Sequence, residues 1–493
     1  MPAHNVRPKP SKRDRSSSST SNRSSSTAAV DGASPAGKTA AERYRRLPTG
    51  THGLDPEVVK RDQRERLQKA MIELIAEKGY RAVRIADLTK LARVSQPSFY
   101  ALYADKEELF ISAYEEIAEH TAKTVIRAYG FDGSQRERLL VAMRAFAELA
   151  AAEPGAMSLL VLGAFGAGAN ALEHRRRSLD ALESSIRMSR DGYCTGDSCD
   201  LTVKSILGGI REVTAARLRQ GRERELRGQL AGELAAWAAC YPRRLPPGLD
   251  APAGTRRAGC RASPPAASER ARRAEGRLPS GRSDLSRQLI VKSQRERIVD
   301  ATAAIVAEKG LAALTIPEIA RRANISHQTF YSIYHSKHDA FLGAQKVGMH
   351  QALLVAVEAY EAHTDDWPCA VAAGLHALID YLSTEPAHAH LTLVDTFAAS
   401  PEAIEIRNAG MNAFAAYLSP GYELAPRHLD PPAIAAEAIA GGIWQVLHHY
   451  IQNDCIAELP RAAPQLVYMA LTPFLGPAEA AEVARRSALG GDR

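Results

Sequence analysis

Cysteines and aromatic residues are scarce in this chain of 493 residues. Its six cysteines imply no disulfide framework, and the one close pair, Cys194 and Cys199, lacks a second pair at metal-ligand spacing. We therefore interpret both as plain thiols. Aromatic residues make up only 6% of the chain, so a core must consist mainly of Leu, Ala, Val and Ile. That composition favours helices over a β-sandwich, and the length predicts two to four domains.

Long apolar segments are equally rare. The N-terminal region is polar and has no apolar stretch of the kind that a secretory signal requires. The longest run without a charged residue, Pro154–Leu172, could cross a bilayer by its length. It is rich in Gly and Ala and stands alone, so we interpret it as a buried core helix. We expect a cytoplasmic protein without a membrane partner.

Positive charge is concentrated in two segments, although the formal net charge is only +7. Residues 1–59 hold ten Lys and Arg against five Asp and Glu, and residues 242–291 hold eleven Arg against four acidic residues. Both segments have few large apolar side chains, so they cannot bury enough surface to offset chain entropy. We predict a disordered basic tail over 1–59 and a disordered Arg/Pro-rich linker over 242–290.

The linker separates two copies of one unit. Residues 63–110 align with residues 294–341 without a gap, at an offset of 231 and with 18 identities in 48 positions. The likeness continues at offsets of 232 and 233, in the pairs Glu153-Pro154 with Glu385-Pro386 and Gly208-Gly209-Ile210 with Gly441-Gly442-Ile443. The duplication therefore covers a whole domain pair and suggests a fused dimer rather than a solenoid.

Each copy begins with an amphipathic helix, after which Gly79 or Gly310 stands where a left-handed residue ends a helix. In the second copy, Thr315 opens a short helix, and Asn324 can turn the chain through a left-handed conformation. Ser326 then caps a second short helix, which we predict over His327–Tyr334. The residues expected to face the core are Ile316, Ile319, Ala323, Phe330 and Tyr334, and in the first copy Phe99 and Tyr103.

Helix, tight turn and short polar-tipped helix is the helix-turn-helix pattern, whose second helix fits the major groove of DNA. A generic helical hairpin is the alternative for a single copy. Two copies that both keep an external Ser or Thr, a Tyr and a Lys favour DNA binding instead. A hydroxyl, a phenol and an ammonium near a helix N-terminus suit phosphate.

At these residues the chain resembles the tetracycline-repressor (TetR) family of bacterial transcription regulators. The resemblance is carried by residues 85–106 and 316–337 and is specific only over the aligned stretch of each copy. It implies an all-α fold in which each copy has three DNA-binding helices followed by a helical effector domain. Members of the family are usually homodimers that pair through a four-helix bundle made by the last two helices of each subunit.

The resemblance also implies roles for individual residues. Serine, threonine, tyrosine and lysine side chains would hold the DNA backbone, whereas Gln96, Pro97, His327 and Gln328 would face bases. Arg84 replaces the Thr-type cap seen at Thr315, so either the first copy is the weaker reader or arginines there add phosphate contacts. The candidate DNA-binding residues are Arg84, Ser95, Gln96, Pro97, Ser98, Tyr100, Lys106, Thr315, Ser326, His327, Gln328, Thr329, Tyr331 and Lys337.

Signatures of an enzyme are weak. The glycines of Gly163–Gly168 do not have the spacing of a dinucleotide fingerprint, and no strand is expected before them. Four histidines of the second copy could converge on a metal, but the first copy has no equivalents and no carboxylate pattern supports them. We interpret His388, His390, His448 and His449 as pocket-lining or surface residues. We expect no catalytic residues, no cofactor and no metal.

We therefore expect a tandem DNA-binding transcriptional regulator, in the first instance a ligand-responsive repressor that is nucleoid-associated. A helical ligand-binding or scaffolding protein that has lost operator binding is the alternative, and a metal-dependent enzyme ranks third. The expected domains are a tail (1–59), a helix-turn-helix domain (60–120), an effector-like domain (121–241), a linker (242–290), a second helix-turn-helix domain (291–351) and a second effector-like domain (352–493).

The duplication also predicts how the copies associate. We expect an intrachain pseudo-dimer or a homodimer, paired through helices near Leu201–Leu218 and Ile434–Ile451. Apolar residues 157–165 and 391–397 either line a small-molecule effector pocket in each copy or are simply core. We expect the first pocket to be apolar and the second to be more polar, because only the second copy carries His388, His390 and Asp395.

Overall fold

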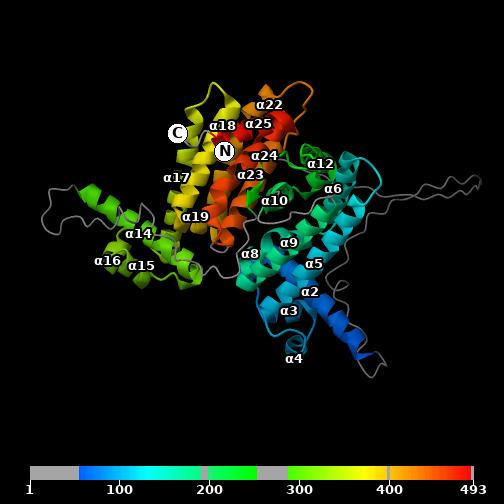
Figure 1. Cartoon of the computed structure of the whole chain (residues 1–493). Helices are drawn as coiled ribbons and strands as arrows, with labels where there is room; N and C mark the ends of the chain where they lie inside the picture. Colours follow the sequence, from blue (N-terminus) through cyan, green and yellow to red (C-terminus); the bar gives the residue numbers. More distant parts are fainter. Residues whose placement is uncertain (1–54, 190–197, 200, 253–286, 397–399, 490–493) are drawn as a thin grey trace, which may run out of the picture. The chain divides into compact units, whose positions relative to one another are not determined.

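The computed structural model describes residues 55–189, 198–199, 201–252, 287–396 and 400–489. Most of the expected basic tail and linker, together with Cys194 and Phe397, lies outside these residues. Within the described residues the fold is helical (Figure 1), and the only strands are β1 (Ser198–Cys199) and β2 (Ala251–Pro252), which pair antiparallel. The expected all-α class is confirmed.

The first copy forms a helix-turn-helix unit followed by longer helices. Its first unit consists of α2, α3 and α4, and the side chains of Ser95 and Asp105 cap α4 and α5. The elements are α2 (Pro56–Ala82), α3 (Ile85–Ala92), α4 (Gln96–Tyr100), α5 (Lys106–Tyr129), α6 (Gln135–Ala152), α7 (Pro154–Ser158), η1 (Leu159–Gly163), α8 (Ala164–Ala167), α9 (Ala169–Ser189), α10 (Thr202–Arg219), α11 (Glu223–Glu225), η2 (Leu226–Leu230) and α12 (Ala231–Ala239).

The second copy repeats this order with local differences. Its helix-turn-helix unit consists of α14, α15 and α16. The predicted caps Thr315 and Ser326 accept backbone hydrogen bonds, and so does Ser336 at the start of α17. The elements are α14 (Arg287–Lys309), η3 (Leu311–Ala313), α15 (Ile316–Arg322), α16 (His327–Tyr331), α17 (Lys337–Glu361), α18 (Trp367–Thr384), α19 (Pro386–Leu393), α21 (Pro401–Ala416), α22 (Pro420–Leu424), α23 (Ala435–Gln452), η4 (Ile456–Ala462), α24 (Ala463–Leu475) and α25 (Pro477–Leu489).

Helices and a strand extend into both segments that the composition predicted to be disordered. Helix α2 begins at Pro56, inside the expected tail, because Asp55 caps it and proline suits the first helical turn. The expected linker is packed at its start, since Leu249 and Ala251 are buried in the main core and Ala251 belongs to β2. At its other end, α14 begins at Arg287. The low apolar content of the segment hid these few anchoring residues.

Two further expectations need correction. The uncharged run Pro154–Leu172 is not one helix, because it is divided among α7, a π-helical turn, α8 and the start of α9, with Gly168 at a φ of 119°. The second recognition helix ends at Tyr331 rather than Tyr334. Tyr334 nevertheless packs in the core as predicted, since it follows the helix in a turn.

One hydrophobic core joins the effector-like parts of both copies. It contains buried residues of α6, α10 and α12 from the first copy and of α18, α23 and α24 from the second. The second helix-turn-helix unit has a separate core around Phe330 and Phe341. The helices expected to associate, α10 and α23, do pack along each other.

The α10–α23 contact is self-complementary. A Cβ placed on Gly208 would overlap Gln445 and lie 3.0 Å from the Gly441 carbonyl oxygen, and one on Gly441 would lie 2.5 Å from Cβ of Glu212. Gln445 and Glu212 occupy matching positions at the offset of 233. Each copy thus presents the same surface to the other, as in a two-fold dimer interface.

A second glycine pair repeats the arrangement. A Cβ on Gly209 would lie 2.5 Å from the Ala438 carbonyl oxygen, and one on Gly442 would lie 2.8 Å from the Ser205 carbonyl oxygen. Ala438 and Ser205 again match at the offset of 233. The two helix backbones therefore approach so closely that side chains are excluded at these four positions.

No single described helix is long and apolar enough to span a membrane. One pair, Gln135–Ala152 with Pro154–Gly163, passes a test of length and composition but is bent by 107°.

The close crossing predicts that Gly209→Ala destabilises the protein. The new methyl would collide with the α23 backbone and with the Trp237 ring, and such overpacking costs about 1–3 kcal/mol. Thermal or denaturant unfolding of the full chain measures the change. Gly232→Ala in α12 is the control, because nothing lies near its Cβ position and alanine favours helices by about 1 kcal/mol. Equal stability of the two variants would contradict the packing described above.

Candidate nucleic-acid interface

Each copy places a short capped helix at the tip of its helix-turn-helix unit. The Ser95 hydroxyl accepts the Ser98 backbone N–H at 3.1 Å, and Phe99 is fully buried beneath α4. Ser326 does the same for Thr329 at 3.0 Å, above the buried Phe330. In this way the cap orients the helix and the aromatic ring holds it against the unit.

Most of the predicted DNA-binding residues are exposed around these helices. Tyr100 and Tyr331 are 57% and 55% exposed, although the tyrosine side chain is largely apolar. Each ring meets the buried phenylalanine beside it edge-on, with centroids 5.4 and 5.6 Å apart. The other exposed candidates are Arg84, Ser95, Gln96, Pro97, Thr315, Ser326, His327, Gln328 and Lys337, whereas Ser98, Lys106 and Thr329 are half-buried. Their DNA contacts stay a prediction.

Two hydroxyl pairs lie at the N-terminal turns of α4 and α16. The Ser95 and Ser98 hydroxyls are 2.8 Å apart, and those of Ser326 and Thr329 are 2.9 Å apart. The pairs therefore belong to the cap itself. A phosphate that approached the turn would meet hydroxyls and backbone N–H groups already oriented towards the helix end.

The two candidate lysines have a structural role in addition to the predicted one. The Lys106 ammonium donates to the carbonyls of Tyr80 and Val83, at 3.0 and 2.9 Å, and lies 4.2 Å from the Tyr80 ring centroid. Lys337 donates to the Leu314 carbonyl at 2.8 Å. Burial lowers the pKa of Lys106. Burial, followed by the nearby Glu107 and Asp105 charges, raises the pKa of Tyr80 to about 12. These lysines thus tie the start of α5 and of α17 to the segment that precedes α3 and α15.

A pair of arginines that the residue patterns did not single out as functional holds the helix-turn-helix bend. Arg66 donates to the carbonyls of Ala92 and Arg93, at 2.6 and 3.1 Å. In the second copy, Arg297 donates at 3.0 and 3.1 Å to the carbonyls of Ala323 and Asn324. Both arginines belong to the repeated Gln-Arg-Glu-Arg segment, so identity between the copies was the available signal.

The bend itself requires a left-handed residue in each copy. Asn324 has φ 51°, as expected, and Arg93 has φ 53° at the matching position of the first copy. The left-handed conformation is less favourable for arginine than for asparagine, and its cost for arginine is on the order of 1 kcal/mol. Gly79 and Gly310 also have positive φ, but their ψ values of 155° and 164° place them outside the left-handed helical region that their sequence context suggested.

An ion pair joins the first two helices of each unit. Lys78 lies 2.7 Å from Asp87, and Lys309 lies 3.0 Å from Glu318. The hydrogen bond from Lys78 is the main cause that lowers the pKa of Asp87. Arg321, then Lys309, lower the pKa of Glu318 to about 2. Because both copies keep this contact, it defines the shared frame of the two units.

The histidines of the second copy pair with carboxylates. His388 Nε2 lies 3.1 Å from Asp300 Oδ1, and His390 Nδ1 lies 2.8 Å from Asp395 Oδ2. Burial lowers the pKa of His448 well below its usual value. Among the described residues, no group of three or more His, Cys, Asp or Glu side chains is placed to hold a metal ion.

Comparison with known proteins identifies both helix-turn-helix units. Residues 68–113 and 298–342 match the family model described as bacterial regulatory proteins, tetR family. These ranges include α3, α4, α15 and α16 with their caps. The search of curated proteins gave no significant match.

Solved structures of regulators are similar at low identity. FadR from Bacillus subtilis in complex with stearoyl-CoA is 17% identical, covers 35% of this chain and 96% of its own, and has a TM-score of 0.32. FadR from Bacillus halodurans gives the same values. A TetR-like regulator from Rhodococcus sp. RHA1 is 18% identical, covers 40% of this chain and 100% of its own, with a TM-score of 0.31. Likeness of this degree carries no argument about ligand or partner.

The arginine contacts predict that Arg66→Met loosens the first helix-turn-helix bend. Losing the charged hydrogen bonds to two carbonyls should cost about 1.5–3 kcal/mol. Hydrogen exchange at the Val94 N–H, which closes the bend onto Thr89, should become faster. The control is Arg64→Met, an exposed position on the same helix, with an effect within about 0.5 kcal/mol. Unchanged exchange in Arg66→Met would show that the bend does not depend on this contact.

Proposed function

The chain is a tandem member of the tetR family of bacterial regulatory proteins, and we propose that its two copies act together on one double-stranded DNA operator. It is a transcriptional regulator, and the proposed activity is ligand-responsive repression by an intrachain pseudo-dimer in the bacterial cytoplasm. One observation carries this proposal. Two helix-turn-helix units expose matching residues and belong to copies whose α10 and α23 helices meet through a self-complementary contact.

Charged contacts across the interface favour pairing of unlike copies. Arg217 binds Glu437 with two hydrogen bonds of 2.8 and 3.0 Å. At the offset of 233, Glu437 corresponds to Lys204 and Arg217 to Tyr450. Two first copies would therefore place arginine against lysine, and two second copies would leave glutamate beside tyrosine. Both like pairings lose the ion pair, and pairing of two first copies also brings two positive charges together. Specificity depends on such unfavourable contacts in the wrong pairing, so they support pairing of a first copy with a second copy.

The segment after α12 also fastens the first copy to the second. The Tyr241 hydroxyl donates to the Met469 carbonyl in α24 at 2.9 Å, and Arg485 donates to the Pro247 carbonyl at 3.4 Å. Leu249 is buried in the shared core. These contacts join the end of the first copy to α24 and α25 of the second copy, which supports pairing within one chain.

The unlike recognition helices predict an operator with unlike half-sites. Gln96 and Pro97 stand where the second copy has His327 and Gln328, and all four are exposed. A Gln side chain can read adenine through two hydrogen bonds in the major groove. We therefore expect selection from random DNA to return a pseudo-palindrome whose two halves differ in sequence.

Substitutions should separate base contacts from backbone contacts. Gln328→Ala should relax preference at one base pair, by about 1–3 kcal/mol. Tyr331→Phe, on the same helix, should weaken binding to all sequences to a similar degree, because phosphate contacts carry no sequence information. Binding assays on an operator and on single-base variants measure both effects. A uniform loss in Gln328→Ala would assign it to the backbone and overturn this orientation of the helix.

The interfacial ion pair predicts energetic coupling in a monomeric chain. In a double-mutant cycle, Arg217→Ala and Glu437→Ala should couple by about 0.5–3 kcal/mol in unfolding experiments. The control cycle uses Lys123 and Glu119, an exposed pair of α5, where about 0–1 kcal/mol is expected. Light scattering should give the mass of one chain, 53.3 kDa. A two-chain mass that persists at nanomolar concentration would count against intrachain pairing.

An apolar cavity in the first copy supports a small-molecule effector. It has a volume of about 210 Å³ and lies among α5, α6, α9, α10 and α12, with Tyr129, Met143, Ile206 and Ile210 in its wall. The apolar lining agrees with the ligand class expected for this copy. Residues 157–165 do not line this cavity. Within that range, Met157 lines a cavity among α2, α5 and α6, and Val161 and Leu162 line a smaller one beside α10. In the second copy, Leu391 packs into the core of the helix-turn-helix unit.

This cavity predicts an apolar ligand that releases DNA. A ligand can act only if it binds the DNA-competent and DNA-incompetent states with different affinity. Apolar small molecules should raise the thermal unfolding temperature and weaken operator binding. Val203→Phe, which fills the cavity from α10, should abolish both effects. Tight binding that leaves DNA affinity unchanged would show that the cavity is not coupled to the recognition helices.

The alternative function is a helical ligand-binding or scaffolding protein without an operator. The exposed recognition residues do not by themselves distinguish it, because a surface can persist after its partner is lost. Sequence-selective binding that weakens steeply with salt supports the regulator, since released counterions accompany phosphate contacts. Ligand binding without any selected DNA sequence would favour the alternative.

A further inference from the structure

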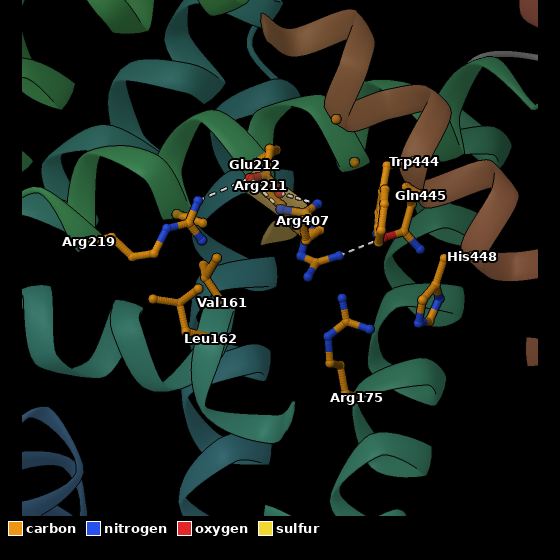
Figure 2. Close-up of a pocket in the computed structure, with 13 residues that line it drawn as sticks. Val161, Leu162, Arg175, Arg211, Glu212, Arg219, Arg407, Trp444, Gln445 and His448 are labelled. Atoms are coloured by element: carbon orange, nitrogen blue, oxygen red, sulfur yellow. Dashed lines mark hydrogen bonds and ion pairs between the residues drawn. The ribbon is translucent and has the colours of Figure 1, made fainter. Parts of the chain in front are cut away.

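A cavity lies where the two copies meet, at some distance in the chain from both recognition helices. Its wall comes from η1, α9 and α10 of the first copy and from α21 and α23 of the second. We call it the interface cavity, and its polar wall consists of Arg175, Arg211, Glu212, Arg219, Arg407, Gln445 and His448. Figure 2 shows Arg175, Arg219 and Arg407 directed into the same space from different helices.

The wall contains four guanidinium groups and one carboxylate. Arg407 holds Glu212 with hydrogen bonds of 2.8 and 2.7 Å, and Arg219 lies 3.1 Å from the same carboxylate. Arg211 instead donates to the neutral Gln445 amide oxygen at 2.8 Å. The carboxylate is thus already shared between two arginines, and the lining of the cavity keeps an excess of positive charge.

Two of these cations are buried, so their charge is costly to keep without a partner anion. Arg175 is 4% exposed and Arg407 is 1% exposed. Burial, then the mutual repulsion with Arg211, lowers the pKa of Arg175. Burial also lowers the pKa of Arg211. Positive charges gathered at low dielectric gain strongly from an anion that accepts their hydrogen bonds.

We propose that the interface cavity binds a small oxyanion of the phosphate class. Guanidinium groups present paired N–H donors whose geometry matches the oxygens of phosphate. Trp444 closes one side, with the Arg407 guanidinium carbon 4.4 Å from its ring centroid, and so fixes the plane of that group. Binding joins helices of both copies, because Arg175 and Arg211 belong to the first copy and Arg407 to the second.

The available space suits a small group. The interface cavity has about 30 Å³, and a neighbouring cavity that shares Arg175 and Arg211 adds about 20 Å³. One water needs about 10–15 Å³ on this measure, so a few oxygen atoms fit and a bulky ligand does not. The neighbouring cavity adds Lys204, whose ammonium is held by Glu183 at 2.7 Å. Free phosphate and the phosphate group of a larger molecule share the chemistry that this lining recognises.

The proposal has a consequence for regulation, and that part rests on the proposed function. An oxyanion that bridges α9, α10, α21 and α23 stabilises one arrangement of the two copies. The spacing of the recognition helices would follow that arrangement, so phosphate would be a second input beside an apolar effector. Anion binding itself requires no DNA and is tested without it.

The test uses the full chain and inorganic phosphate. Thermal unfolding is followed while phosphate replaces chloride at constant ionic strength, and calorimetry measures the dissociation constant. A ligand that binds only the folded state raises the unfolding temperature with concentration. Wild type should show this rise. Arg211→Gln and Arg175→Gln should bind phosphate about tenfold more weakly or worse, since each removes a charged hydrogen-bond donor.

Arg177→Gln is the matched control. Arg177 lies on α9 two residues after Arg175, is exposed, and pairs with Glu173 outside the interface cavity. Its phosphate affinity should stay within about twofold of wild type. Without phosphate, the site variants should be no less stable than wild type, because they relieve buried repulsion. Their lost response to phosphate is the expected signature.

Two results would overturn the proposal. One is a wild-type protein that responds to phosphate no more than to chloride, a result that stands even if a site variant fails to fold. The other is a phosphate response in folded Arg211→Gln that equals that of Arg177→Gln. Methyl phosphate distinguishes the sources: tighter binding than inorganic phosphate indicates a phosphorylated metabolite, and weaker binding indicates free phosphate. Operator binding measured separately shows whether the anion site or the proposed regulator has failed.

Discussion

The crossing of α10 and α23 brings two helix backbones into direct contact, and much of the structure depends on it. Four glycines, two from each copy, let each helix approach the backbone carbonyl oxygens of the other. Any side chain there would separate the helices and open the core that surrounds them. That core is shared, because α6 and α12 of the first copy and α18 and α24 of the second pack around the same crossing.

The crossing is symmetric in its backbone and asymmetric in its charges. Matching glycines make equivalent contacts in both directions, as expected for a duplicated two-fold interface. The polar contacts around it have diverged: Arg217 meets Glu437, and Arg407 meets Glu212, without mirror-image partners. The two copies thus keep the same backbone contact at the crossing and differ in the charges around it.

The helix-turn-helix units show a different pattern. Their internal polar contacts are the same in both copies, whereas some of their exposed residues differ. Arg66 with Arg297, Lys78 with Lys309, and Lys106 with Lys337 make equivalent contacts in the two copies. These polar contacts hold the first helix, the bend and the recognition helix in one frame. Exposed residues at the helix tip differ between the copies and contribute little to that frame. Such a division lets recognition change without loss of the fold.

Local signals along the chain determined the all-α class, the duplication and the caps of each recognition helix. Those features depend on neighbouring residues, so Ser95, Ser326 and the buried Phe99 and Phe330 could be assigned without coordinates. Long-range contacts could not be assigned from the sequence in this way. The carbonyl partners of Arg66 and Lys106, the burial of Leu249 in an apparently unstructured linker, and the gathering of Arg175, Arg211 and Arg407 join residues far apart in the chain. Periodicity and capping are local properties of the backbone, whereas the neighbours of a buried charge exist only after distant helices have packed.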